Sequence, residues 1–403
     1  MQESLAKIAY GAVAAAVACV GLVATATMAT AASPSAERST AVRAPAPRDP
    51  PREIRLAFVG QALIKTDLRA DAPEAVAQAR EYLAGADAVF TNLEVSVAVP
   101  GVPLTPRTPD TEYSEPPVLD ALAAMGFNLL SLANNHAWDL LEPGMLATRA
   151  LVERQGFAHA GTGRNVAEAA APGVLPTPAG DVALVAMASG GIQLTPDSHA
   201  GEGKPGVNYL AVDGEGRLDP AQRARILASV RAAAATGALV IAYHHNHVWG
   251  AARGVDGPPG RDRRIDRFTT PVWMEKWARE LVDAGAHVFV AHGNPALHGV
   301  EVRRGRLILY GLGNHVFQSR NHLDRFGPLA YQSVAVQATF RRGRVAEVRF
   351  TPLVLGMVER ARGVPYRAQG GEALAILGRL EDLSRPYGTR LRFDEREAVL
   401  LTR

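Results

Sequence analysis

The feature that most constrains the fold is an alternation of short apolar runs with helix-like stretches, which begins at Ile54. Short apolar runs bounded by turn residues are typical of buried strands, and apolar residues three and four apart are typical of amphipathic helices. This alternation predicts an α/β sheet with helices on both faces. The predicted strands are 54–59, 86–90, 128–132, 181–187, 238–243 and 286–291, and the predicted helices are 72–83, 117–125, 143–155, 220–235 and 270–284.

The C-terminal part of the chain has a different pattern. Four strand-like runs follow one another closely, with Gly305 and Gly343 in the expected turns. Such spacing predicts antiparallel strands that close the far side of the sheet. These runs are 297–302, 307–310, 332–340 and 345–354. No linker-like stretch interrupts the sequence after Arg52, so residues 53–403 are expected to form one domain.

The N-terminal segment is predicted to direct export. Residues 8–36 carry no charged side chain and follow Lys7, and the small residues of 29–31 fit a cleavage site that leaves Ala32 as the first mature residue. The run is also long enough for an uncleaved membrane anchor, and Cys19 leaves a lipoprotein as a third alternative. Export would place the protein outside the cell, in the periplasm or in the cell envelope.

Residues 1–31 are therefore interpreted as a signal peptide or membrane anchor, the protein's one predicted contact with a membrane. Residues 32–52 contain five prolines among Ser, Ala and Arg, which predicts a flexible linker.

Composition limits the class of partner. The chain is 47% hydrophobic and 21% charged, which is typical of a globular protein. The net charge is only +3 and no run of five Lys or Arg occurs, so a nucleic-acid partner is not predicted. The single cysteine lies in the N-terminal segment, so the domain is expected to have neither a disulfide nor a thiolate metal site.

Polar residues gather where the predicted strands end. Ligands of α/β sheets bind at the carboxyl ends of strands, so these clusters are predicted to form one shared site. The clusters are Gly60-Gln61, Thr91-Asn92-Leu93-Glu94, Asn134-Asn135-His136 with Asp139, His244-His245-Asn246-His247, and His292-Gly293-Asn294.

Each cluster also has a structural alternative. A single Asn after a strand is commonly a helix cap or turn residue, and an isolated histidine such as His159 is commonly a surface or core residue. His245 and His247 differ, because alternate residues of a strand face the same way, which suits two imidazoles on one cation.

The residue types suggest metal chemistry. Neutral His, an Asn carbonyl and a carboxylate together suit Mn²⁺, Fe²⁺ or Zn²⁺. Such ions polarise a phosphoryl group and activate water. His136, oriented by Asp139, could then act as the general acid on the leaving group.

At these positions the chain resembles the CapA family, named for a protein of poly-γ-glutamate capsule synthesis. The resemblance runs from about residue 54 to 355 and implies a calcineurin-like metallophosphoesterase fold, a layered sandwich of mixed sheets flanked by helices. It also implies a role in the cell envelope. The matching segments are Phe58-Val59-Gly60-Gln61, Thr91-Asn92-Leu93-Glu94, Leu132 to Asp139, Gly161-Thr162-Gly163, His245-Asn246-His247, Ala291-His292-Gly293, Gly299-Val300-Glu301 and Tyr310 to Phe317.

The resemblance implies roles residue by residue. His136 would be the acid and Asp139 its orienting partner. The implied metal-site residues are Glu94, Asn135, His245, His247 and His292. The residues expected on the substrate side are Gln61, Asn92, Asn134, Arg263, Arg264 and His298, the arginines as ligands for carboxylates or phosphates or as part of a solvated loop.

Two departures from the family pattern matter. Gln61 stands where the family usually has Asp, and Pro295 stands where it usually has a second His. His298 lies three residues further on and could replace that histidine, and His315 is an addition where the family usually has Phe. A neutral amide bridges two cations poorly, so the sequence predicts one ion rather than two, and a metal-free state stays open.

Three functions remain open at this point. The first is a metal-dependent hydrolase or transferase that acts on an anionic envelope polymer, such as poly-γ-glutamate, or on a phosphoester. The second is metal-free acid/base catalysis of the peptide-epimerase kind, in which His136, His245, His247 and His292 move protons. The third is a non-catalytic scaffold anchored in a polymer-export complex.

Overall fold

The computed structural model describes residues 53–108, 111, 113–191, 194–248, 268–319, 326–357 and 362–401. All of them belong to the compact unit Ala46–Arg403. The predicted segments 1–31 and 32–52, and the loop arginines Arg263 and Arg264, lie outside the described residues, so their assignments stay predictions. Among the described residues, no helix has the length and apolar character needed to cross a bilayer.

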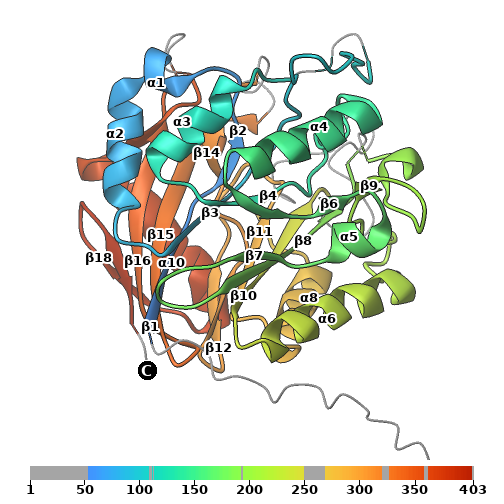
Figure 1. The fold of residues 1–403 in the computed structure, drawn as a ribbon. Helices are drawn as coiled ribbons and strands as arrows, with labels where there is room; N and C mark the ends of the chain where they lie inside the picture. Colours follow the sequence, from blue (N-terminus) through green and yellow to red (C-terminus); the bar gives the residue numbers. More distant parts are fainter. Residues whose placement is uncertain are drawn as a thin grey trace, which may run out of the picture. The chain divides into compact units, whose positions relative to one another are not determined.

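Two mixed sheets form the centre of the unit (Figure 1). In the nine-stranded sheet the order is β18 (Leu391–Phe393), β19 (Ala398–Leu400), β16 (Arg344–Leu355), β15 (Gln332–Arg341), β1 (Glu53–Phe58), β3 (Ala88–Asn92), β4 (Leu129–Ser131) and β5 (Ala158–Ala160), with β17 (Pro365–Arg367) beside β16. In the six-stranded sheet the order is β12 (Val300–Arg303), β13 (Arg306–Leu309), β11 (Val288–His292), β10 (Leu239–Asn246), β8 (Val182–Ser189) and β7 (Gly173–Leu175).

The two sheets pack face to face. Leu56 and Phe90 of the first sheet share one core cluster with Ile241 and Val290 of the second, and none of the four has exposed surface. Successive strand residues point to opposite faces, so Ala57, between Leu56 and Phe58, belongs to a different cluster on the outer side. The apolar side chains of this shared cluster hold the two sheets together.

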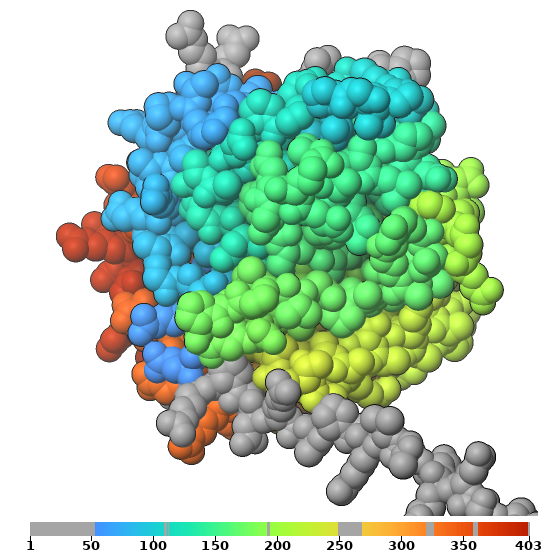
Figure 2. All heavy atoms as spheres, in the orientation of Figure 1, coloured from blue at the N-terminus to red at the C-terminus, as the bar shows by residue number. Residues whose placement is uncertain are grey.

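Helices cover the outer faces. The cluster outside the first sheet includes side chains of the helices α1 to α3, and the cluster outside the second includes those of α6 and α8. Figure 1 places these groups at its upper left and lower right, and Figure 2 shows side chains from the blue to yellow-green part of the chain covering this side of the sheets. The helices are α1 (Leu68–Asp71), α2 (Pro73–Tyr82), α3 (Pro117–Met125), α4 (Leu141–Arg154), α5 (Val166–Ala170), α6 (Pro220–Ala235), α8 (Val272–Asp283) and α10 (Gly370–Ser384), with 3₁₀ turns η1 (Pro196–Ser198), η2 (Pro328–Tyr331) and η4 (Arg385–Tyr387).

Two short two-stranded ladders lie outside the large sheets. β2 (Gln61–Leu63) pairs in parallel with β14 (Asn314–Phe317), and β6 (Thr162–Gly163) pairs with β9 (Gly206–Val207). Gly60 permits the first ladder, because a Cβ there would lie 2.5 Å from the backbone of Gly313 and Asn314. This close approach brings β14 next to Gln61.

The predicted fold class, an α/β layered sandwich of mixed sheets flanked by helices, is confirmed. The simpler expectation of one sheet with helices on both faces was wrong, because the inner faces cover each other. The runs expected to close that sheet divide between the two: β15 and β16 join the first, whereas β12 and β13 join the second. The strand expected to end at Tyr243 continues to Asn246.

Candidate functional site

The candidate site lies where strand ends from both sheets meet. β1, β3 and β4 run parallel in one sheet, and β8, β10 and β11 run parallel in the other, so the carboxyl ends of each set share an edge. Glu94 follows β3, Asn135 follows β4, and His245 lies near the end of β10. Residues that are far apart in the sequence therefore meet between the sheets.

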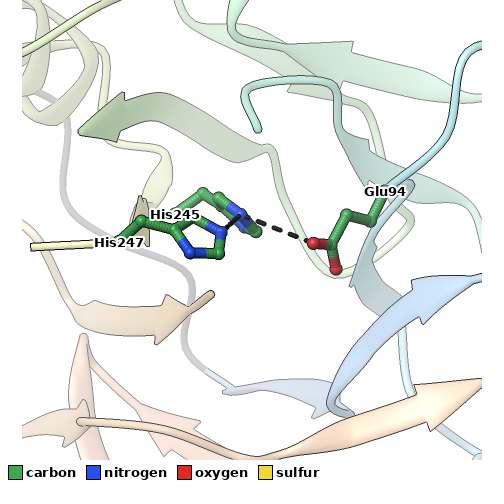
Figure 3. Close-up of side chains that lie close together, drawn as sticks. All are labelled: Glu94, His245 and His247. Atoms are coloured by element: carbon green, nitrogen blue, oxygen red, sulfur yellow. Dashed lines mark hydrogen bonds and ion pairs between the residues drawn. The ribbon is translucent and has the colours of Figure 1, made fainter. Parts of the chain in front are cut away.

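Glu94, His245 and His247 form a cluster whose potential ligand atoms all lie within 4.8 Å of one another. The His245 Nε2 atom is 3.0 Å from His247 Nε2 and 3.6 Å from Glu94 Oε1, and it is 2.8 Å from Asn135 Oδ1. Figure 3 shows the two imidazoles together, with the Glu94 carboxylate pointing toward them. Glu94, Asn135 and His245 are buried, and His247 is partly buried.

The donor set fits a divalent cation. Two ligands about 2.0–2.1 Å from one ion lie about 2.9–3.4 Å apart at bond angles between 90° and tetrahedral, and the two Nε2 atoms are 3.0 Å apart. The Glu94 Oε2 atom is buried and has no hydrogen-bond partner in the described part of the chain. Burial raises the pKa of Glu94 to about 8. A bound cation would supply the positive charge that compensates the ionised Glu94 carboxylate in this buried position.

Neighbouring side chains contact the His245 ring at Nδ1, on the side opposite the cluster. The His245 Nδ1 atom is 3.3 Å from the Tyr243 hydroxyl and 3.4 Å from Asn92 Nδ2. Asn134 Nδ2 in turn donates to Asn92 Oδ1 at 3.1 Å and to the Leu93 carbonyl at 2.7 Å. Asn92 and Asn134, expected on the substrate side, are fully buried and bonded to each other. Burial keeps the pKa of His245 well below its usual value, so its ring is neutral.

A second group of side chains lies next to the cluster, in the loop after β4. The His136 Nδ1 atom is 2.7 Å from Asp139 Oδ2, and Arg107 Nε is 3.5 Å from Asp139 Oδ1. Burial opposes the charge of His136, but the charge and hydrogen bond of Asp139 outweigh it and raise the His136 pKa. His136 side-chain exposure is 22%, against 3% for Asp139, so the histidine can meet a substrate while its partner stays buried.

Gln61 is held away from a ligand role. Its Oε1 atom accepts from the Gly293 backbone N–H at 2.8 Å, and its Nε2 atom donates to Asn314 Oδ1 at 3.0 Å. Asn314 Nδ2 donates to the Ala330 carbonyl at 2.9 Å. The amide of Gln61 thus links β2, β14 and the loop after β11.

His298 does not take the place of the missing histidine. Its Nδ1 atom is 3.1 Å from Thr270 Oγ1, and its Nε2 atom is 3.0 Å from Asn294 Nδ2. His315 is fully buried against the rings of Tyr82 and Phe127, at centroid distances of 6.1 and 5.4 Å. Both histidines therefore contribute to packing rather than to the cluster.

His292 ends β11 and is 1% exposed. Its ring stacks near Phe90 and meets Tyr243 edge-on at 5.3 Å. Burial lowers the His292 pKa to about 3, with a small opposing effect from the Val59 backbone. The charge of a protonated His292 would help to lower the pKa of His245. His292 does not belong to the compact cluster that the described residues form.

Two contributors were not predicted from the sequence. Tyr243 shares a strand face with His245 two residues away, so strand periodicity could have identified it. Arg107 lies in an irregular loop, and its backbone N–H donates to the Asp139 carbonyl at 2.8 Å. No local pattern marks Arg107, because its contact depends on how two loops meet.

Comparison with known proteins now assigns the family. The model of the family described as bacterial capsule synthesis protein PGA_cap matches residues 55–319. The chain belongs to this family. All the strand ends that build the candidate site, from Gln61 to His292, lie within the matched region. Membership supports involvement in capsular or envelope polymer metabolism.

The chain is also similar to individual known proteins. An uncharacterized protein of Sinorhizobium fredii is 29% identical, over 79% of this chain and 87% of its own length. A Mycobacterium tuberculosis protein named "probable polyglutamine synthesis accessory protein" is 27% identical, over 76% of this chain and 74% of its own. A solved phosphatase structure from Mycoplasma pneumoniae aligns with a TM-score of 0.43 and 10% identity, over 75% of this chain and 94% of that one.

Proposed function

We propose that this protein is a metal-dependent hydrolase or transferase of capsular or envelope polymer metabolism that uses one divalent ion, Mn²⁺, Fe²⁺ or Zn²⁺. The observation that carries the proposal is the Glu94, His245 and His247 cluster, in which a buried carboxylate oxygen has no partner among the described residues. Family membership supports the polymer role. The substrate would be an anionic polymer of the poly-γ-glutamate type or a phosphoester.

Glu94, His245, His247 and the Asn135 carbonyl would hold the ion. When bound, such an ion polarises the scissile group and lowers the pKa of a water molecule. Tyr243 would accept the Nδ1–H of His245 and so leave Nε2 free for ligation, in the way that outer-shell partners orient metal-bound histidines.

His136 would protonate the leaving group from Nε2, while Nδ1–H remains hydrogen-bonded to Asp139. Asp139 fixes the ring orientation and favours the protonated form of His136, and Arg107 lies 3.5 Å from the other carboxylate oxygen of Asp139. The side-chain amides of Asn92, Asn134 and Gln61 make internal hydrogen bonds, so we assign them to positioning rather than to substrate contact. Arg263 and Arg264 stay candidates for binding the anionic substrate.

The test is a count of bound metal. The full chain is purified without chelator, and Mn, Fe and Zn are measured per chain by elemental analysis. We expect about one ion in the wild type, near zero in His245→Ala, and about one in the control His159→Ala, because His159 pairs with Glu153 away from the cluster. A wild-type chain that stays empty after incubation with excess Mn²⁺ and Zn²⁺ would rule out the metal-dependent reading.

A metal-free acid/base enzyme is the second candidate. His245 has close polar neighbours at both ring nitrogens without any cation, and His136 with Asp139 forms a complete proton-donating pair. The same count separates the two readings. Turnover of a γ-glutamyl peptide by metal-free protein, lost in His136→Ala and unchanged by added Mn²⁺, would favour the metal-free candidate.

We also propose export through residues 1–31, with linker 32–52 connecting the domain to the membrane or the secretion machinery and with partners in an envelope complex. N-terminal sequencing of the protein recovered from the extracytoplasmic fraction tests this. A mature terminus at Ala32 supports a cleaved signal, an intact N-terminus in membranes supports an anchor, and cytoplasmic protein only contradicts export.

A further inference from the structure

A pocket lies on the outer side of the six-stranded sheet, away from the candidate metal site. Its volume is about 710 Å³, and it is lined by the turn that precedes α6, by Arg223 of α6 and by α8 from Val272 to Glu280. Figure 1 shows α6 and α8 next to each other on that face of the sheet. Volumes of this size suit small molecules, and nothing in the proposed reaction uses the pocket.

Two tryptophans form its floor. Trp273 is 8% exposed and Trp277 is 1% exposed, and neither indole nitrogen has a hydrogen-bond partner among the described residues. Gly216 packs on Trp273, where an added Cβ would lie 2.9 Å from the Trp273 Cβ atom and 3.1 Å from its Cγ and Cδ1 atoms. Because Nε1 is bonded to Cδ1, the nitrogen-bearing side of the ring lies beside the Gly216 turn, which also lines the pocket.

The charges around the pocket are not fully compensated. Arg217 pairs with Asp213 and Glu215, and Arg223 pairs with Glu280. Lys276 also lines the pocket and is exposed, but it has no acidic partner in the described part of the chain. One cation therefore faces a pocket whose floor is aromatic. Among the described residues, the buried unpaired groups of that floor are the two indole nitrogens, which can only donate hydrogen bonds.

The pocket is separate from the metal site but adjacent to its supporting strand. The Trp273 ring meets His244 edge-on at a centroid distance of 5.8 Å. His244 precedes His245 on β10 and therefore faces the opposite side of the sheet. A ligand in this pocket would lie behind the strand that carries His245, and could not be the same molecule that reaches the metal cluster.

We propose that this pocket binds a small anion with an aromatic or otherwise apolar body, which Trp273 and Trp277 contact through their rings while Lys276 pairs with its charge. The proposal does not rest on the proposed catalytic function. The apolar contact supplies most of the affinity, because a single pair with an exposed lysine contributes little.

The test compares two dyes of nearly the same shape: 8-anilinonaphthalene-1-sulfonate, which is anionic, and N-phenyl-1-naphthylamine, which is neutral. Fluorescence titration of the full chain should give a Kd for the anionic dye on the order of tens of micromolar. Lys276→Gln should weaken that binding about three- to fivefold and leave the neutral dye unchanged. Lys204→Gln, a lysine bonded to the Pro196 carbonyl, should change neither.

A second variant protects the test against loss of fold. Val272 is 65% exposed at the mouth of the pocket, and Val272→Glu places a carboxylate in the first turn of α8, a position that favours acidic residues. It should weaken the anionic dye and spare the neutral one. Absence of saturable binding of the anionic dye, or equal affinities for it in the wild type, Lys276→Gln and Val272→Glu, would overturn the proposal.

Discussion

Glu94→Gln should make the metal-free protein more stable while it abolishes metal binding. The folded-state pKa of Glu94 is about 8, against 4.5 for the free side chain. An acid whose pKa is raised on folding destabilises the folded state above its unfolded pKa, and that cost grows with pH until the folded pKa is passed. At 1.36 kcal/mol per pH unit, the carboxyl costs about 3 kcal/mol at pH 7 and about 5 kcal/mol above pH 9.

The neutral amide of glutamine removes this cost but adds an N–H group that needs a partner, a loss of about 1 kcal/mol. We therefore expect the variant to gain about 2 kcal/mol in the free energy of unfolding at pH 7. The gain should be near zero at pH 5 and should reach its full value above pH 8. The wild type should recover stability when metal is added, by about 2.7 kcal/mol at a hundredfold excess over Kd, and the variant should not.

Urea unfolding with chelator, followed at pH 5, 7 and 9, measures these differences. Glu153→Gln is the matched control, because Glu153 is a surface acid with 49% side-chain exposure, and it should stay within about 0.5 kcal/mol of the wild type. A metal-free Glu94→Gln protein that is less stable than the wild type at pH 9, or that still gains stability from metal, would refute the reasoning.

Other variants probe the remaining groups of the site. Asp139→Asn removes the charge and hydrogen bond that raise the His136 pKa, so the alkaline limb of the kcat/KM profile should move to lower pH, and an unmoved limb would contradict the acid role. Tyr243→Phe should weaken metal affinity about 10- to 100-fold without unfolding the chain, measured by competition with a chelating dye, because His245 loses its outer hydrogen bond. Gln61→Ala should lower the free energy of unfolding by about 2–4 kcal/mol, because it leaves two buried groups unpaired, yet keep about one ion per chain by elemental analysis.

Elements with strong local signals were predicted closely. The helices expected at 117–125 and 220–235 have those bounds in the structure. Asp219 caps α6 through its bond to the Gln222 N–H, Pro220 follows at the first helical position, and Gly126 ends α3 in a left-handed conformation. These signals act within a few residues, so a single sequence is enough to predict where these helices begin and end.

The two-sheet arrangement was less accessible, because it depends on contacts between distant segments. The sequence predicts that β10 ends at Tyr243, because polar residues follow. In the structure His244 and His245 stay in the strand. Packing against Trp273 buries His244, and a contact with Asn135 helps to bury His245. The structure brings four of the implied metal-site residues, Glu94, Asn135, His245 and His247, close together. Their function stays a prediction that the metal count tests.

Gln61 shows how a sequence departure gains a physical meaning only in the structure. From the sequence, a neutral amide in place of an acid is simply a lost ligand. In the fold, its oxygen accepts from the Gly293 N–H and its nitrogen donates to Asn314 Oδ1, while the Asn314 amide nitrogen is already committed to the Ala330 carbonyl. A carboxylate could not donate to Asn314 Oδ1, so it would place two acceptors against each other in a buried site.

The surroundings of Gln61 are therefore matched to an amide, and restoring an acid there would break a satisfied network. A second ion at this position would need both that acid and a rearranged Asn314. A single ion needs neither, because Glu94, His245 and His247 already converge, and one carboxylate oxygen of Glu94 has no hydrogen-bond partner among the described residues. The hydrogen bonds around Gln61 thus favour the one-ion proposal independently of the cluster itself.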